Sequence, residues 1–322
     1  MSKPPGPGRP AARSIAFGAV GMVLVGSSVA VSRTLTAAPL CTAQAIRYSM
    51  AAVILVAVAR RLHIPIAAPR GREWLLLAGL SAAGLVLFNV AIVRGVAHAQ
   101  PAMIAVAVAC VPVLLGVLGP LMQGQRPRLP VVVAAAIVTV GAVLVEGAGH
   151  ASAAAIAWAT LALACEAAFT LLAVPLLPRH GAWGVSVHAV WLGAVMFAVL
   201  GGITDGPAAA ARLTASDLVA ASYLAVLVTV AAFVLWYSAV AALGPGRAGL
   251  ITGIAPVAAA MTGIALGSRA PDPLMWAGIA VVAGGLAAGL SARPNPTQHT
   301  GQATLRPTES ERVAAGQVAP TP

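Results

Sequence analysis

Charged residues are scarce in this chain, and their scarcity excludes most soluble folds. Only 8% of the 322 residues are Asp, Glu, Lys or Arg, whereas 60% are hydrophobic. A soluble protein needs about 25% charged residues to cover its surface. Most of the surface of this protein therefore faces something other than water.

Lysine and the acidic residues are nearly missing, which changes the meaning of the net charge of +11. Lys3 is the only lysine, and 8 acidic residues stand against 19 basic ones. The basic residues are dispersed between apolar runs and form no contiguous patch, so no nucleic-acid partner is predicted. A retinal protein is also excluded, because Lys3 lies outside every apolar run.

The chain lacks the motifs of disulfide frameworks, nucleotide sites and metal sites. Its 3 cysteines are odd in number and lie in or beside apolar runs, which does not suit a disulfide framework. Residues 244–249 match G-x-G-x-x-G, but they follow an apolar helix pattern instead of a strand. There is no P-loop motif, and the 6 histidines are scattered. We therefore expect no cofactor, no metal and no direct use of ATP.

Long apolar runs are what the chain has in abundance. A bilayer core requires about 20 mostly apolar residues per helix. Backbone groups in lipid must bond internally, so runs of this length are helical. Ten segments qualify, at residues 14–32, 39–59, 73–93, 100–120, 130–146, 152–175, 184–203, 217–240, 246–267 and 273–291. The sequence predicts an all-α membrane protein with ten transmembrane helices, the first of which is not a cleaved leader.

The basic residues are distributed unequally between the two sides of the membrane. With a cytoplasmic N-terminus, fourteen of them fall on the inner side and four on the outer side, namely Arg33, Arg94, Arg212 and Arg269. The positive-inside rule then places both termini in the cytoplasm. We expect a multi-pass protein of the cell (inner) membrane, with a cytoplasmic segment at 1–13 and a disordered cytoplasmic tail at 292–322.

The two halves of the chain resemble each other at a shift of 144 residues. This shift superimposes the members of four pairs, Pro101 on Pro245, Pro112 on Pro256, Gly119 on Gly263 and Gly141 on Gly285. The predicted spans coincide as well, which gives repeats at 14–146 and 152–291. Each repeat holds five spans, and because five is odd the second repeat enters the membrane from the opposite side. Two inverted five-helix repeats are a common plan for secondary transporters.

The plan resembles the drug/metabolite transporter superfamily, EamA type. The second span, PLCTAQAIRYSMAAVILVAVARR, is similar to the second helix of that family, with Arg47-Tyr48 followed by small and branched residues and a basic end. The ends of both repeats resemble the family's short turn, mid-helix proline and Gly-rich last helix. The resemblance covers about residues 14–291, and it implies a transporter of small molecules, directed outward. Where the family often has a glutamate after its fourth and ninth helices, this chain has Gln125 and Arg269, so no role of that glutamate is carried over.

Two charged residues lie inside predicted spans and are candidates for substrate binding or coupling. Arg47 lies about 12 Å and Glu166 about 21 Å from the outer ends of their helices. Arg47 either contacts an anion or braces neighbouring helices through their carbonyl groups. Glu166 either carries a coupling proton, or bonds between helices as a neutral acid, or pairs with Arg47.

The other candidates are uncharged. Polar residues that are candidates to line a cavity, or to bond between helices, are Gln44, Asn89, His98, His188 and Trp236. Pro112 and Pro256 fall inside spans four and nine, where a lost helical hydrogen bond creates either a hinge near a binding site or a packing kink. We expect two G-x-x-x-G pairs to let the last two helices pack closely, and they consist of Gly263, Gly267, Gly285 and Gly289.

These observations favour a secondary active transporter that exports a small metabolite or drug, with the lipid bilayer as its surroundings and a proton as a candidate coupling ion. An importer or exchanger of the same fold is the first alternative. A scaffold without solute flux is the second. An intramembrane enzyme is disfavoured, because Glu166 is the only acid deep inside a predicted span. The oligomeric state stays open.

Overall fold

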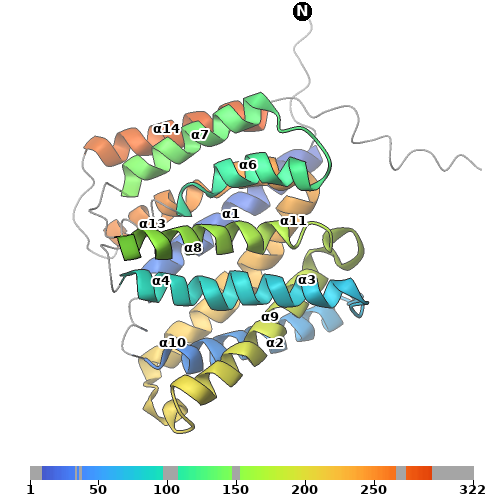
Figure 1. Ribbon diagram of the computed structural model, residues 1–322, viewed down its shortest axis with the longest axis vertical. Helices are drawn as coiled ribbons and strands as arrows, with labels where there is room; N and C mark the ends of the chain where they lie inside the picture. The colour runs from blue at the N-terminus through green and yellow to red at the C-terminus, as the bar shows by residue number, and fades with distance from the viewer. Residues whose placement is uncertain are drawn as a thin grey trace, which may run out of the picture. The chain divides into compact units, whose positions relative to one another are not determined.

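The computed structural model describes residues 9–32, 35, 38–96, 108–146, 153–265 and 273–291, and every regular element within them is helical (Figure 1). The elements are α1 (Arg9–Ser32), α2 (Leu40–Arg61), α3 (Arg72–Ser81), η2 (Ala82–Leu87), α4 (Phe88–Val96), α6 (Val111–Met122), α7 (Leu129–Glu146), α8 (Ala153–Leu171), α9 (Leu177–Thr204), η3 (Ala209–Arg212), α10 (Ala215–Tyr223), η4 (Leu224–Ala231), α11 (Ala232–Leu243), α12 (Pro245–Ile251), α13 (Ile254–Ala265) and α14 (Pro273–Ser291). The all-α prediction is confirmed for these residues. The predicted tail at 292–322 lies outside them.

Seven helical segments of the described residues are long and apolar enough to cross a membrane, and three further apolar helices are shorter. The shorter helices are Val111–Met122, Leu129–Leu144 and Ile156–Leu171. Each of the ten predicted spans overlaps one of these segments. The multi-pass helical plan is therefore confirmed, while the number of ten crossings stays a prediction.

The helices of the two halves correspond at the predicted shift of 144 residues. Moved by this shift, α2 covers 184–205, and α9 ends at Thr204. Moved likewise, α7 covers 273–290, which matches α14 almost residue for residue. The helical elements thus repeat along the chain as the proline and glycine pairs predict.

The correspondence includes an unusual element, a π-helical segment in the third span of each half. The first is η2, between α3 and α4, and the second is η4, between α10 and α11. Moved by 144 residues, η2 covers 226–231, which lies within η4. A π turn closes its hydrogen bonds over five residues instead of four, and such turns are frequent at functional sites. Both halves therefore carry the same local distortion at the same place.

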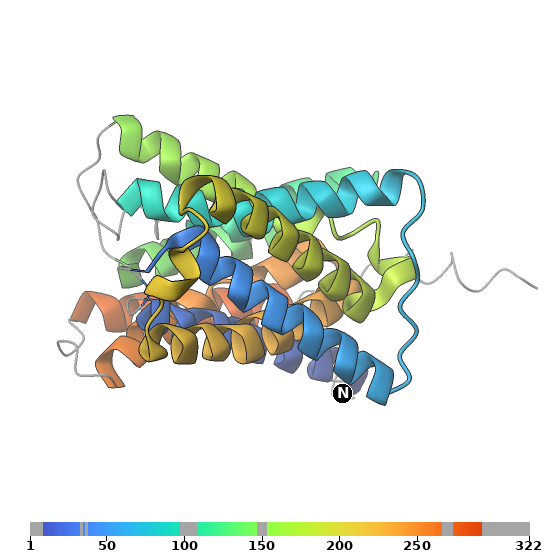
Figure 2. The same ribbon diagram turned by 90° about the horizontal axis from the view of Figure 1, so that it is seen from below.

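Helix α2 packs along α9, and the two lie side by side in both ribbon views (Figures 1 and 2). The rings of Tyr48 and Phe197 stack between them, with centroids 5.5 Å apart and planes at 10°. Helix α2 also packs against η4. The second span of the first half is thus in contact with two spans of the second half, which positions its polar residues at the boundary between the halves.

Helices α7 and α14 approach each other closely through glycines (Figure 1). A Cβ atom at Gly141 would lie 2.7 Å from the backbone nitrogen of Val282, and one at Gly285 would lie 3.0 Å from that of Val138. These contacts are reciprocal, because Gly141 and Val138 are the repeat counterparts of Gly285 and Val282. Gly289 lies against Ala134, so the two helices run antiparallel.

Gly285 and Gly289 were expected to let the last two helices pack closely. The nearest neighbour of Gly289 is Leu250 of α12, which belongs to the ninth predicted span, and Gly289 also lies against Ala134 of α7. The nearest neighbours of Gly285 lie in α7, because the last helices of both repeats form a pair. Close packing of the last two helices through these glycines stays a prediction. Gly263 lies within α13, and Gly267 lies outside the described residues.

Pro112 and Pro256 each lie in the first turn of a helix, α6 and α13 respectively. The residues just before these two helices, 109–110 and 252–253, form turns that interrupt the helical path. A proline in the first helical turn loses no intrahelical hydrogen bond, because its N–H would be unpaired there. Each proline therefore follows a helix interruption instead of kinking a continuous helix. Whether the two interruptions act as hinges stays a prediction.

Candidate functional site

Four polar residues from three spans form a connected group, which we call the central polar cluster: Gln44 and Arg47 of α2, Asn89 of α4 and Thr229 of η4. Arg47 donates from Nε to Thr229 Oγ1 at 3.0 Å and from Nη1 to Gln44 Oε1 at 3.3 Å. Gln44 Nε2 donates to Asn89 Oδ1 at 2.9 Å. Three of the sequence candidates are therefore brought together, and Thr229 joins them from the other half of the chain.

The two ends of this cluster rest on the π-helical segments. Asn89 Nδ2 donates to the carbonyl oxygen of Leu85 in η2 at 2.6 Å. Thr229 Oγ1 donates to the carbonyl oxygen of Leu224 in η4 at 3.0 Å. Side chains commonly satisfy backbone groups where a regular helical ladder is disturbed. The distorted segments of the two halves are thus connected to each other through α2.

The cluster is shielded from the surroundings. Gln44, Arg47 and Thr229 are 7%, 8% and 0% exposed. The guanidinium of Arg47 also lies over the ring of Tyr48, with Cζ 4.9 Å from the ring centroid. Such an arrangement holds a cation by ring contact and by neutral acceptors, with no acidic side chain in the cluster.

Glu166 lies apart from the central polar cluster, on α8. Within the described residues it makes no hydrogen bond and no ion pair, so its pairing with Arg47, one of the three predicted alternatives, is absent from this conformation. Near it, α8 is bonded to α11: Trp236 Nε1 donates to Thr170 Oγ1 at 3.1 Å, and the Tyr237 hydroxyl donates to the Phe169 carbonyl at 3.2 Å.

Trp236 was a candidate to line the substrate cavity. Its side chain is 3% exposed and its N–H is already bonded to Thr170, so it forms part of the contact between α8 and α11. His188 lies on α9, where Nε2 contacts the carbonyl oxygen of Ala67 at 2.9 Å. Ala67 belongs to the connection between α2 and α3, so His188 holds that connection instead of joining the cluster. His98 lies outside the described residues.

At the end of the molecule where α3 and α9 begin, an ion pair joins the two helices. Glu73 bonds Arg179, and its Oε2 also lies 3.2 Å from His180 Nε2. Arg179 further donates to the carbonyl oxygen of Ala68 at 2.8 Å. This group fastens the connection between α2 and α3 onto α9 close to His188.

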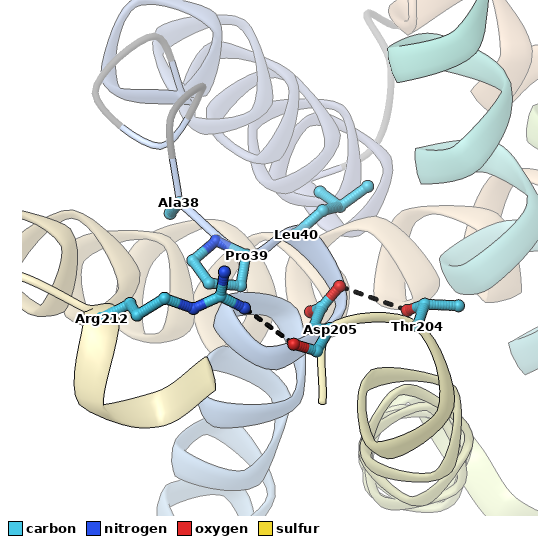
Figure 3. Close-up of a pocket in the computed structure, with 6 residues that line it drawn as sticks. All are labelled: Ala38, Pro39, Leu40, Thr204, Asp205 and Arg212. Carbon is cyan, nitrogen blue, oxygen red and sulfur yellow. Dashed lines mark hydrogen bonds between the residues drawn. The ribbon is translucent and has the colours of Figure 1, made fainter. Parts of the chain in front are cut away.

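At the end where α2 begins, a pocket of about 420 Å³ opens between α2 and α9 (Figure 3). Its lining consists of Ala38, Pro39, Leu40, Thr204, Asp205 and Arg212. Asp205 Oδ2 accepts from the Thr42 backbone N–H at 2.8 Å and from its hydroxyl at 3.0 Å, so a carboxylate caps the start of α2. Arg212 donates to the backbone oxygen of Asp205 at 2.7 Å.

Sequence reasoning missed Thr229, Asp205 and the two π-helical segments. Thr229 is one hydroxyl in an apolar run, and nothing in a single sequence indicates which helix it faces. The π-helical segments contain no proline and only one glycine, Gly84, so they give no breaker signal. The 144-residue shift relates the two π-helical segments to each other, but this relation appears only when the structures of the two halves are compared.

Comparisons with known proteins agree with this architecture. The model of the EamA-like transporter family matches residues 12–147 and 153–289. The chain is similar to the uncharacterized transporter YetK of Bacillus subtilis, at 25% identity over 83% of this chain and 84% of that protein. It is also similar to a probable terminal-alkyne amino-acid exporter of Streptantibioticus cattleyicolor, at 28% identity over 72% of this chain and 77% of that protein.

The fold is shared with a solved protein crystal structure. The two superimpose with a TM-score of 0.70 over 85% of this chain and 97% of the other, at 18% identity. At this identity the likeness concerns the fold alone. The two family matches divide the chain where the 144-residue repeat divides it.

Proposed function

The chain belongs to the EamA-like transporter family, and from that premise we propose that it exports a small polar metabolite or drug across the cell membrane by alternating access. The resemblance seen in the sequence is thereby confirmed, and the protein is a membrane transporter. The observation that carries the finer proposal is the central polar cluster. A charged side chain inside a membrane is costly, so its presence marks a ligand site or a solute pathway. Arg47 is only 8% exposed and lies among polar side chains from three spans.

The two-repeat architecture supports alternating access. Inverted repeats allow two structures of similar energy, because the halves can exchange their conformations. The interruptions before Pro112 and Pro256 and the two π-helical segments occupy equivalent places in the halves, so each half has the same places to bend. The central polar cluster lies between the halves, where an exchange of conformations would expose it to one side and then to the other.

We further propose that Glu166 couples transport to protons. A charged carboxylate inside a span costs several kcal/mol unless it is paired. Glu166 has no hydrogen-bond or ion-pair partner within the described residues, so protonation is its simplest way to become neutral. Release of the proton on one side would link proton movement to solute movement. The absence of a nucleotide motif from the sequence agrees with a gradient as the energy source.

The outward direction is supported by one relative, whose name describes a probable exporter. Import or exchange by the same fold is the alternative, and a scaffold is the other. Comparing the metabolites in the medium of deletion and overexpression strains tests direction and activity together. Solutes that accumulate outside with overexpression support export, and solutes that are depleted support import. A scaffold would change neither.

The coupling proposal is tested by flux in proteoliposomes with and without an imposed pH gradient. Glu166→Gln mimics the protonated acid at nearly constant shape, so we expect it to lose the response to the gradient and to keep gradient-free exchange. Glu166→Asp should keep part of the response. Arg47→Lys is the comparison variant, and it should alter coupling only if the two groups meet in another state. A full response of Glu166→Gln to the gradient would contradict the proposal.

A further inference from the structure

We propose that the transported solute carries a single carboxylate, which binds the free edge of the Arg47 guanidinium in the central polar cluster. This inference rests on the proposed transport function and deepens it by naming the charge and chemistry of the substrate. It is carried by the hydrogen bonds that Arg47 makes, by the charge balance around it and by the position of its remaining donors.

The hydrogen bonds of the cluster run in one direction, away from Arg47. Arg47 donates to Gln44, Gln44 donates to Asn89, and Asn89 donates to the carbonyl oxygen of Leu85. On the other side Arg47 donates to Thr229, which donates to the carbonyl oxygen of Leu224. Every acceptor that faces Arg47 is therefore neutral and held in place by its own onward bond. This arrangement stabilises the positive charge without neutralising it.

Arg47 keeps donors for a ligand. A guanidinium has five N–H donors, and the bonds to Thr229 and Gln44 use two of them. Nη2 has no acceptor among the described residues, and it is not one of their sealed, unpaired polar atoms. Part of the Nη2 surface is therefore accessible to a ligand, although the residue as a whole is 8% exposed. A planar guanidinium edge of this kind matches the two oxygens of a carboxylate.

The charge balance points to an anion. Among the residues whose side chains the structure describes, the acids are bonded elsewhere or lie apart from Arg47: Glu73 bonds Arg179, Asp217 bonds Thr214, Asp205 bonds Thr42, and Glu166 lies on α8. Within this part of the chain Arg47 has no acidic partner, and a buried unpaired cation is unfavourable. A solute with one negative charge would supply the missing counterion as it binds.

The charge of the central polar cluster also indicates which class of anion it would bind. The cluster holds one cation and no second basic residue, so a monoanion neutralises it and a phosphate dianion would leave an excess negative charge. A cationic solute would add a second positive charge in a low-dielectric site, where like charges repel strongly. The site therefore favours carboxylates over organic phosphates and over cationic drugs.

The experiment uses the full-length protein in proteoliposomes filled with a small-molecule extract of the cells that express it. Mass spectrometry identifies the solutes whose release depends on the protein. We expect these solutes to carry a free carboxylate. Arg47→Gln should slow their release about 10- to 100-fold, which corresponds to the loss of charge-assisted hydrogen bonds. Arg47→Lys should recover part of the rate, because it restores the charge without the planar edge.

Two controls separate binding from folding. Arg60→Gln makes the same substitution on the same helix at an exposed position, and it should release solutes at the wild-type rate. The methyl ester of an identified solute lacks the carboxylate charge, while the protein stays unchanged. Its protein-dependent release, measured after subtracting release from protein-free liposomes, should be about tenfold slower.

The outcomes distinguish this inference from the proposed function. Protein-dependent release of solutes without a carboxylate, or equal release of acid and methyl ester, would overturn the carboxylate proposal and leave the transporter intact. Wild-type release by Arg47→Gln would do the same. No protein-dependent release of any solute would count against transport itself.

Discussion

Gln44 and Arg47 of α2 have repeat counterparts in His188 and Trp191 of α9, 144 residues along the chain, and the two pairs use the same backbone frame differently. In the α2 pair Arg47 donates to Gln44, and the two residues also donate outward, to Thr229 and to Asn89. In the α9 pair, Trp191 Nε1 donates to His188 Nδ1 at 3.2 Å, and His188 Nε2 bonds the carbonyl oxygen of Ala67. The α9 pair is thus closed on itself and on a connecting segment.

The difference teaches how a duplicated fold divides its tasks. The helices of the halves coincide closely, including the π-helical segments, whereas the polar side chains at equivalent positions do not. A charged cluster with free donors lies at one position, and a neutral, fully bonded pair lies at its counterpart. Conformational symmetry and chemical asymmetry therefore coexist, as a transporter with one substrate site between two similar halves requires.

The largest expected contrast concerns the side of the membrane on which the connections between helices lie. A cysteine at Asp205, where α9 ends, should react with an impermeant thiol reagent added outside intact cells. Cysteines at Gly71, before α3, and at Pro127, before α7, should not react. The physical reason is the excess of arginine on the inner side. Labelling is measured by a mass shift on a gel, with permeabilised cells as the control for reactivity. Labelling at Gly71 or Pro127 in intact cells would reverse the proposed orientation.

The second prediction compares Thr229, the hydrogen-bond partner of Arg47, with Trp191 of the α9 pair. Thr229→Val removes the acceptor of Arg47 Nε and the donor to the Leu224 carbonyl, both buried. We expect it to lower the free energy of unfolding by about 1–3 kcal/mol and to slow transport about tenfold. Trp191→Phe removes one hydrogen bond from the neutral pair, so about 1 kcal/mol or less of stability should be lost and transport should change little.

Thermal unfolding in detergent and solute flux together check this prediction. Thr229→Ser keeps the hydroxyl and is the matched control, which should behave nearly as the wild type. Equal transport losses for Thr229→Val and Trp191→Phe would mean that the central polar cluster and the pair of His188 and Trp191 contribute equally to transport.

The third prediction tests whether the halves bend alike. Pro112→Ala and Pro256→Ala place a flexible residue after each helix interruption. Because both prolines lie in a first helical turn, stability should fall by only about 1 kcal/mol or less. Transport should slow several-fold in each variant, more than expression falls, and by similar factors. Flux per amount of protein in the membrane is the measurement, and wild-type rates in both variants would make the prolines packing features only.

The smallest effect on transport is expected at the glycines of α7 and α14. Gly141→Ala and Gly285→Ala each introduce a Cβ too close to backbone atoms of the opposite helix. Since the contacts are reciprocal, the two variants should lose similar stability, about 1–3 kcal/mol. Gly202→Ala, on α9 with open space around the position, is the control. A strongly unequal loss in thermal unfolding would show that the two contacts are not equivalent.

The sequence predicted the helices well, because long apolar runs and the 144-residue shift are local or periodic features. Gln44, Arg47 and Asn89 were among its candidate residues, together with Glu166, His98, His188 and Trp236. It could not place Thr229 beside Arg47, since the lateral packing of helices depends on shape complementarity between residues that are 182 positions apart. His188 and Trp236 were candidates either to line a cavity or to bond between segments, and in this conformation they bond Ala67 and Thr170. Polarity alone does not decide between the two alternatives.

The matched π-helical segments also have a historical consequence. A π turn accommodates one more residue than an α turn over the same rise, so it records a single-residue insertion in a helix. Two independent insertions at one repeat position would be a coincidence. The simpler history is that one insertion occurred in an ancestral chain of one repeat, and that the gene was duplicated afterwards. On this account the π-helical segment of the third span is older than the duplicated chain, and the asymmetric chemistry of α2 and α9 was added later.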